Sequence, residues 1–203
     1  MTFWLSLPIF LMAVVFHEVS HGWVAYKLGD PTAKYAGRLT LNPLVHIDPI
    51  GTLFLPGFLV LLNSPVVLGW AKPVPVNFSN LFHPKRDMIW VGLAGPAANI
   101  ALAILFSWLI RLPVIAQSAG LSSLCALAVL INLVLAVFNA VPIPPLDGSR
   151  ILTGLLPPRQ ARILLALEPF GFLILILLVW LKVLDRVVWP IVLFLASLLG
   201  VQV

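Results

Sequence analysis

"FHEVSHGWVA", residues 16–25, places two histidines and a glutamate inside an otherwise apolar stretch of the chain. The run before it, Phe3 to Val15, contains no charged residue, and Trp23, Val24 and Ala25 resume the apolar pattern. A charged side chain at the middle of a bilayer costs roughly 2.5–3.5 kcal/mol, so ionisable residues within a membrane span usually face a polar interior and serve a function. The stretch therefore predicts a membrane helix that carries a polar site.

The composition of the whole chain is that of a membrane protein. Of its 203 residues, 61% are hydrophobic and 9% are charged, whereas charged residues make up about 25% of a typical soluble domain. Lys and Arg are scattered between apolar segments, and the net charge of +5 predicts a basic membrane face and no nucleic-acid site. The single cysteine, Cys125, excludes an internal disulfide.

The apolar segments fall at about 3–26, 52–70, 88–110, 121–141, 163–181 and 187–201. A helix needs roughly 20 residues to cross the hydrocarbon core. We therefore expect an all-α polytopic membrane protein with five to six transmembrane helices. The Pro-rich connections 27–51 and 71–87 are expected to be loops at the membrane surface.

Residues 17–21 match the pattern H-E-x-x-H. On a helix, residues four apart share a face, so the imidazoles of His17 and His21 can hold one metal ion. Glu18 lies about 100° around the helix, where its carboxylate can accept a proton from a water at the metal. A catalytic zinc usually has three protein ligands, so one more must come from elsewhere.

Candidates for the third ligand are the aspartates of the chain: Asp30, Asp48, Asp87, Asp147 and Asp185. Asp147 stands out because it ends "NAVPIPPLDG", residues 139–148, whose prolines terminate the preceding helix. Broken backbone costs several kcal/mol against lipid unless it lines a protein cavity, so a broken helix that carries a carboxylate suits a buried metal site. An aspartate in a surface turn is the alternative, and this segment alone leaves both open.

Three motifs, in this order, resemble those of the site-2 proteases, membrane-embedded zinc metalloproteases that cut transmembrane segments of other proteins. They are HEVSH at 17–21, GPAAN at 95–99 and NAVPIPPLDG at 139–148. The resemblance implies His17, His21 and Asp147 as ligands of one Zn²⁺ per chain and Glu18 as the general base. It also suggests that Asn139 and Asn99 are polar groups near the substrate carbonyl. "NPLVHIDPIG" at 42–51 and "GWAKPVPVN" at 69–77 further resemble the short bacterial and archaeal members.

The function implied by the resemblance is that of an intramembrane zinc endopeptidase of a prokaryotic cell membrane, which acts in regulated intramembrane proteolysis on a transmembrane-helix substrate within the lipid bilayer. We expect a single membrane-embedded peptidase domain over 1–203, without a PDZ or CBS domain. Its catalytic core would cover about 3–150, and additional C-terminal helices would cover about 163–203.

Two other functions are compatible with a metal motif in a membrane helix. The first is a catalytically inactive metal-binding membrane protein that holds a partner helix, and the second is a metal transporter. Glu18 argues against the first, because zinc binding alone does not need that carboxylate. The clustering of the ligands at one level argues against the second, because a transport path needs ligands along its length.

The topology follows from joining the two parts of the site. His17 and His21 lie toward the C-terminal end of the first helix and Asp147 follows the end of 121–141, so both ends must share one side. This requires that 52–70 re-enters. Arg111, Lys182 and Arg186 then lie opposite the other nine of the twelve Lys and Arg residues, and the nine mark the cytoplasmic side. We predict five spans, a re-entrant element at about 52–70 and a site nearer the cytoplasm; a deeper site with bent helices would allow six spans.

Three further polar residues and one element have open roles. His46 and Asp48 could form a second metal site, gate access, or stabilise a loop. Glu168 lies within an apolar segment, so it is expected to be protonated or paired. The 52–70 element, with the adjoining Val74-Pro75-Val76, could offer an unwound substrate an edge strand to pair with.

Overall fold

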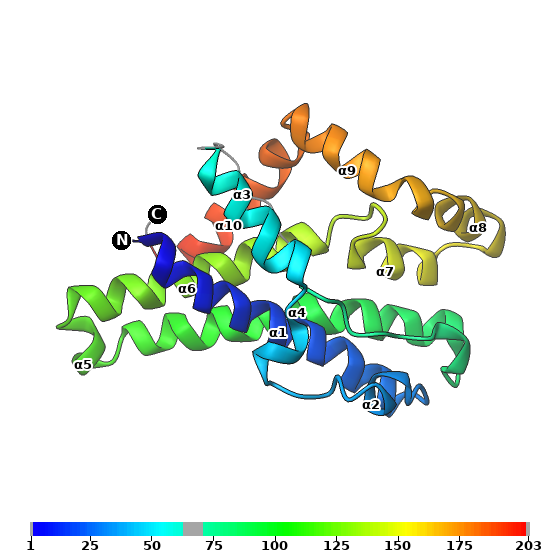
Figure 1. The fold of residues 1–203 in the computed structure, drawn as a ribbon, viewed down its shortest axis with the longest axis horizontal. Helices are drawn as coiled ribbons and strands as arrows, with labels where there is room; N and C mark the ends of the chain where they lie inside the picture. The colour runs from blue at the N-terminus through cyan, green and yellow to red at the C-terminus, as the bar shows by residue number, and fades with distance from the viewer. Residues whose placement is uncertain (1, 63–70, 202–203) are drawn as a thin grey trace.

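The computed structural model describes residues 2–62 and 71–201, and Figure 1 shows its helical architecture. Over these two ranges the chain forms helices, turns and extended segments but no β-strand. The α-helices are α1 (Thr2–Lys27), α2 (Thr32–Tyr35), α3 (Leu55–Leu61), α4 (Pro84–Ile110), α5 (Pro113–Ala116), α6 (Ala119–Asn139), α7 (Asp147–Leu155), α8 (Pro158–Ala166), α9 (Gly171–Trp180) and α10 (Val183–Leu198). Short 3₁₀ turns cover Pro43–His46, Phe78–Asn80 and Glu168–Phe170, and a π-helical turn covers Pro49–Phe54.

Within the described residues, four helical segments are long and apolar enough to cross a membrane. They are Ser6–Lys27, Pro84–Ile110, Ala119–Asn139 and Pro158–Trp180. The chain is therefore a polytopic integral membrane protein, as predicted, and its described part is built from helices. The expected segment 187–201 belongs to α10, whose 16 residues fall short of the roughly 20 that a span needs.

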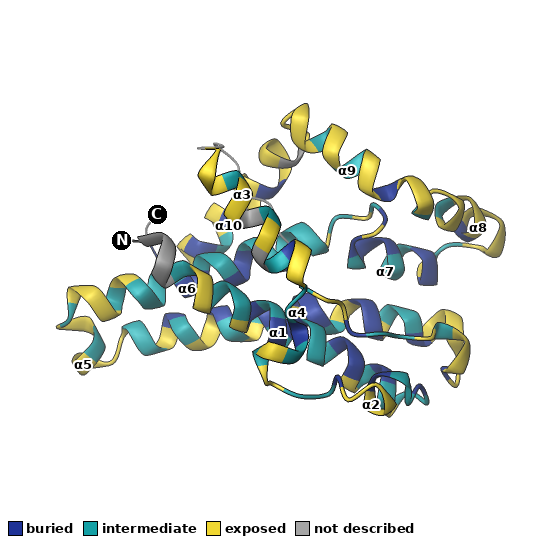
Figure 2. Ribbon diagram, viewed as in Figure 1, coloured by how far each residue is buried: buried dark blue, intermediate teal, exposed yellow. Residues whose placement is uncertain are grey.

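The helices α1, α4 and α6 form the centre of the molecule, with α1 and α6 running in the same direction and α4 opposite to them (Figure 1). Small buried residues lie on these helices: Ala13 on α1, Gly95 and Ala103 on α4, and Ala128 and Ala136 on α6. Small side chains let helices approach closely, which drives helix packing in lipid. Figure 2 shows the buried residues gathered along this centre and on α7, whereas α8 and α9 are mostly exposed.

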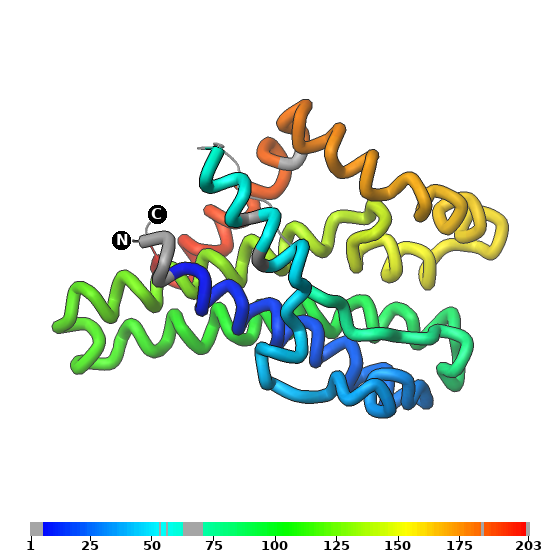
Figure 3. Tube along the Cα trace, viewed as in Figure 1, coloured from blue at the N-terminus to red at the C-terminus, as the bar shows by residue number. Residues whose placement is uncertain are grey.

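The connection between α1 and α4 begins and ends at the same end of the bundle. The backbone N–H of Phe82 donates to the carbonyl of Leu28 at 2.9 Å, and the trace returns beside α1 before α4 begins (Figure 3). The segment between these helices therefore makes no net crossing, as the predicted topology requires. Within it, Pro49–Leu61 is a short apolar helical segment. Residues 63–70 lie outside the described residues, so the re-entrant path of 52–70 stays a prediction.

The buried carboxylate of Asp30 holds the two arms of this connection together. It accepts hydrogen bonds from the N–H of Asn77 at 2.7 Å and from Nδ2 of Asn80 at 2.9 Å. Burial raises the pKa of the Asp30 carboxyl, but hydrogen bonds from Thr32, Asn80 and Asn77 outweigh this effect and leave the pKa below its ordinary value. Asp30 is thus an ionised group that stabilises the loop, and within the described residues it belongs to no metal-binding group.

Candidate metal centre

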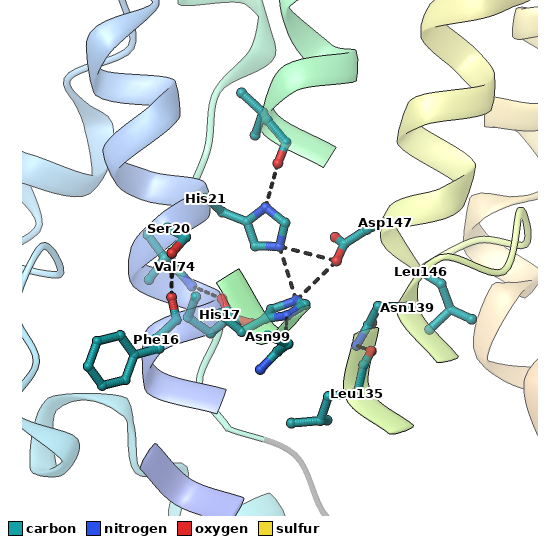
Figure 4. Close-up of polar contacts among 12 residues, drawn as sticks. Phe16, His17, Ser20, His21, Val74, Asn99, Leu135, Asn139, Leu146 and Asp147 are labelled. Atoms are coloured by element: carbon teal, nitrogen blue, oxygen red, sulfur yellow. Dashed lines mark hydrogen bonds and ion pairs between the residues drawn. The ribbon is translucent and has the colours of Figure 1, made fainter. Parts of the chain in front are cut away.

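Three side chains converge where α1 passes the start of α7 (Figure 4). His17 Nε2 lies 3.0 Å and His21 Nε2 lies 3.2 Å from Oδ2 of Asp147. The two Nε2 atoms are 3.1 Å apart. Among the residues that the structure describes, this is the only group of His, Cys, Asp or Glu side chains placed to hold a metal ion. Asp147 is therefore the one aspartate that the fold brings to the histidines.

The geometry of this group suits a zinc ion. Zn–N and Zn–O bonds of about 2.0–2.1 Å in a tetrahedron separate neighbouring ligand atoms by about 3.3 Å, close to the distances observed. Gly95 of α4 lies directly against the two imidazoles, because a Cβ there would be 2.3 Å from Nε2 of His21 and 2.5 Å from Nε2 of His17. Two histidines and a carboxylate, with a fourth position left for water, are the donor set of a catalytic zinc site.

Hydrogen bonds behind His17 determine which of its nitrogens faces the site. Asn132 Nδ2 donates to the carbonyl of Ala128 at 2.8 Å, which leaves Asn132 Oδ1 to accept from Asn99 Nδ2 at 2.8 Å. Asn99 Nδ2 also donates to the carbonyl of Ala13 at 3.1 Å. Asn99 Oδ1 must then face His17 Nδ1, at 2.6 Å, and accept its proton. The Nε2 of His17 is left with a lone pair for a metal.

A backbone carbonyl orients His21 in the same way. The Nδ1 of His21 lies 2.6 Å from the carbonyl oxygen of Val91 on α4. Because a carbonyl oxygen only accepts, Nδ1 carries the proton and Nε2 presents its lone pair to the site. Both histidines are buried, so these contacts hold the imidazoles in the orientation and tautomer that metal binding needs.

Asn99, which was predicted to lie near the substrate carbonyl, is not among the residues that line the cavity. Its side chain is fully buried and bonded to the outer nitrogen of His17, so it orients a candidate ligand. Asn139, by contrast, lines the cavity beside the metal ligands, with Nδ2 donating to the carbonyl of Leu135 at 2.9 Å. Its contact with a substrate stays a prediction.

Removing the Asn99 side chain should weaken zinc binding without unfolding the protein. We expect Asn99→Ala to lower zinc affinity about 10- to 100-fold, since groups that orient metal-binding histidines contribute this much. Competition with a chelator of known affinity would measure the change. Ser107→Ala is the matched control, because it removes another buried polar group of α4 that bonds locally to Ile104. Equal zinc affinity in both variants would show that Asn99 does not support His17.

The chain reaches Asp147 through a sharp turn after α6. The helix ends at Asn139, and the N–H of Leu146 donates to the carbonyl of Ile143 at 2.9 Å within the turn. The start of α7 then packs on the end of α6 so closely that a Cβ on Gly148 would lie 2.2 Å from the carbonyl oxygen of Ala140. The prolines end one helix, the glycine permits the contact, and together they place the carboxylate in the site.

A cavity of about 290 Å³ opens beside the three ligands. Its walls come from α1, α4, α7, the end of α6 and the extended segment before α4, and its polar lining residues are His17, Glu18, His21, Asn139, Asp147 and Arg150. One carboxylate oxygen of Glu18, Oε2, accepts a hydrogen bond from the backbone N–H of Val74 at 2.8 Å. The candidate base therefore lines the same cavity as the candidate ligands.

Arg150 is a cavity residue that the sequence did not single out. Its guanidinium forms an ion pair with Glu168 and lies over the ring of Phe78, 5.2 Å from the ring centroid. Of the two alternatives expected for Glu168, protonated or paired, the structure shows the paired one. The helix also breaks at this point into the 3₁₀ turn Glu168–Phe170. Arg150 links the start of α7 to this turn and to the extended segment beside the cavity.

The loop residues His46 and Asp48 have structural contacts. The buried His46 ring bonds through Nε2 to the carbonyl of Thr40 at 2.9 Å. Asp48 Oδ1 accepts from the N–H of Ile50 at 3.0 Å and from that of Gly51 at 2.7 Å, which caps the following turn. In the part of the chain that the structure describes, neither belongs to a metal-binding group, so loop stabilisation is the role that their contacts support.

Comparisons with known proteins show which proteins the chain is similar to. The profile of Peptidase family M50 matches residues 110–178. YwhC of Bacillus subtilis, whose name designates a candidate zinc metalloprotease, is 38% identical over 187 residues, which are 89% of this chain and 82% of YwhC. Rip2 of Mycolicibacterium smegmatis, with the same designation, is 34% identical over 184 residues, which are 91% of this chain and 70% of Rip2.

The similarity extends to an archaeal protein. MJ0611 of Methanocaldococcus jannaschii, also designated a candidate zinc metalloprotease, is 29% identical over 155 residues, or 75% of this chain and 71% of that protein. No solved structure matches the chain significantly. Since the alignment with YwhC covers most of both proteins, the chain belongs to peptidase family M50, the site-2 proteases, and is a zinc metalloprotease of the membrane.

Proposed function

We propose that this metalloprotease is an intramembrane endopeptidase that cleaves transmembrane segments of other membrane proteins, as a step of regulated intramembrane proteolysis. The observation that carries the proposal is the position of the site. His17 and His21 lie within the membrane-spanning segment Ser6–Lys27, and the cavity beside them is lined by the helices of the bundle. This position supports cleavage of a polypeptide at the level of the membrane.

The residues of the cavity account for peptide hydrolysis. His17, His21 and Asp147 would hold a zinc ion, which would supply the Lewis acidity that polarises a carbonyl and lowers the pKa of water. Glu18 accepts the proton of the attacking water and passes it to the leaving amine. Asn139 faces the substrate from the cavity wall. The distances among His17, His21 and Asp147 support these roles, and so does the position of Glu18 and Asn139 in the lining of the same cavity.

A transmembrane substrate must unwind before it is cut, because a helix holds its carbonyl groups in internal hydrogen bonds. The unwound segment would need new backbone partners at the site. Residues 71–77 are extended beside the cavity, which favours pairing with a substrate in strand conformation. The neighbouring residues 63–70 lie outside the described part, so this edge strand stays a hypothesis.

We further propose that the protein resides in a prokaryotic cell membrane with the site nearer the cytoplasmic side. The end of the bundle where α1 ends and α4 begins carries Lys27, Lys34, Lys85 and Arg86. The short connection α4–α6 at the other end carries only Arg111. Lys and Arg concentrate in cytoplasmic loops, so this asymmetry supports the orientation.

Metal removal and the position of the cut test the proposal together. The purified protein and a single-span model substrate would be placed in the same liposomes and the products analysed by mass spectrometry. We expect cleavage inside the apolar segment, at least about 100-fold slower after zinc is chelated, and restored by added Zn²⁺. Cuts confined to the segments outside the membrane, or an unchanged rate after chelation, would contradict the proposal.

A further inference from the structure

A strap, residues 72–80, runs along the cavity; it is extended as far as Asn77, ends in the 3₁₀ turn Phe78–Asn80 and is fixed on both sides of its central part. At one end the N–H of Lys72 donates to the carbonyl of His46 at 2.8 Å. Farther along, the N–H of Asn77 donates to the buried carboxylate of Asp30 at 2.7 Å. The backbone between these two points is therefore held at both of its ends.

Val74 lies in the centre of the strap and packs directly on α1. Its side chain is buried, and a Cβ on Gly22 would lie 2.6 Å from its Cγ1. Its neighbours Pro73 and Pro75 have no N–H, so Val74 carries the only backbone donor between Lys72 and Val76. That donor is directed at Oε2 of Glu18, at 2.8 Å.

We propose that the backbone N–H of Val74 is a positioning group for the general base of this protease. The inference rests on the proposed function, in which Glu18 moves the proton. A glutamate side chain has three rotatable bonds, and a hydrogen bond to one oxygen fixes the carboxylate plane and holds the other oxygen, Oε1, in a defined place. Within the described residues, Oε1 accepts no hydrogen bond from the protein. It remains for the proton of the attacking water, and a base that is already oriented reacts faster.

The contact is compatible with an open site. Pro73, Val74, Val76 and Phe78 form one wall of the 290 Å³ cavity, so the space beside the metal ligands exists while the strap is bonded to Glu18. The guanidinium of Arg150 over Phe78 supports the far end of the same wall. The strap thus holds the base from the side and leaves the cavity to the substrate.

An ester in place of the Pro73–Val74 amide tests the proposal most directly. Incorporation of α-hydroxyisovaleric acid at position 74 removes the N–H and keeps the isopropyl side chain that packs on Gly22. We expect kcat to fall about 10- to 100-fold, the loss typical of a hydrogen bond to a charged group, while KM stays within about threefold. Zinc content and the unfolding temperature should match those of protein made by the same route with valine at position 74.

A genetically encoded variant provides the second measurement. Val74→Pro also removes the N–H, and proline suits the position because the residue before Pro75 is already restricted to extended conformations. We expect the same loss of kcat. An unchanged kcat in the ester protein, or a rise that would mark the contact as inhibitory, would overturn the inference.

Two measurements distinguish an error in the role of the Val74 N–H from an error in the proposed function. If the valine-containing control does not cut a transmembrane substrate, the proposed function fails. The hydrogen bond itself is tested without turnover by hydrogen exchange of the Val74 amide, which we expect to be at least about 10-fold faster in Glu18→Ala than in the wild type. Equal exchange rates would contradict the inference whatever the substrate is.

Discussion

Glu18→Gln is expected to abolish cleavage and to leave the zinc in place. The three candidate ligand atoms belong to His17, His21 and Asp147, so a glutamine at position 18 changes no ligand. The amide keeps the shape of the carboxylate and can still accept from the N–H of Val74, but it cannot take up a proton at neutral pH. Since general acid–base catalysis contributes about 10²–10⁴ to a rate, we expect kcat to fall at least about 100-fold.

Initial cleavage rates in liposomes and zinc content by atomic absorption would check this result on the same preparations. Asp147→Asn serves as the contrast, because it removes the anionic ligand and should lower both zinc content and activity. Loss of activity with zinc retained in one variant and lost in the other assigns the two carboxylates to different roles. A Glu18→Gln protein with more than about one tenth of the wild-type rate would exclude Glu18 as the base.

The parts of the site that follow from local spacing could be predicted. His17 and His21 are one helical turn apart, and a helix places such residues on one face whatever packs around it. Asp147 could be singled out because prolines break the helix before it, although only the fold shows that its carboxylate lies 3.0 Å from His17 Nε2. The sequence also predicted that the segment between α1 and α4 returns to the side of the membrane from which it starts, because His17 and His21 had to meet Asp147.

The contacts that could not be predicted join distant segments through groups with no sequence signal. Asn99 is 82 residues from His17, and only packing of α4 against α1 and α6 shows that it faces the outer nitrogen of the ring. The donor to Glu18 is a backbone N–H, which every residue except proline carries. Arg150 pairs with Glu168 because the fold brings α7 beside the 3₁₀ turn Glu168–Phe170, and nothing in the residue pattern indicates this contact. Such pairings depend on tertiary structure and not on the pattern of residue types.

Gly95→Ala should remove zinc from an otherwise folded protein. A Cβ at this position would lie 2.3 Å from Nε2 of His21, 2.5 Å from Nε2 of His17 and 2.6 Å from Cε1 of His17. Atoms do not approach this closely, so either the rings or α4 must move. The rings cannot easily withdraw, because Asn99 and the carbonyl of Val91 hold them from behind at 2.6 Å each.

The methyl group would therefore occupy the space toward which both lone pairs point. We expect zinc affinity to fall at least about 100-fold, because tight metal binding depends on ligand positions correct to within about 0.2 Å, and activity should fall with it. Chelator competition would measure the affinity, and thermal unfolding would show whether the fold persists. Gly120→Ala is the matched control, since a Cβ there meets nothing within 4 Å. Full zinc occupancy in Gly95→Ala would contradict this prediction, because it would show that the rings or α4 can move far enough to keep the metal beside the added methyl group.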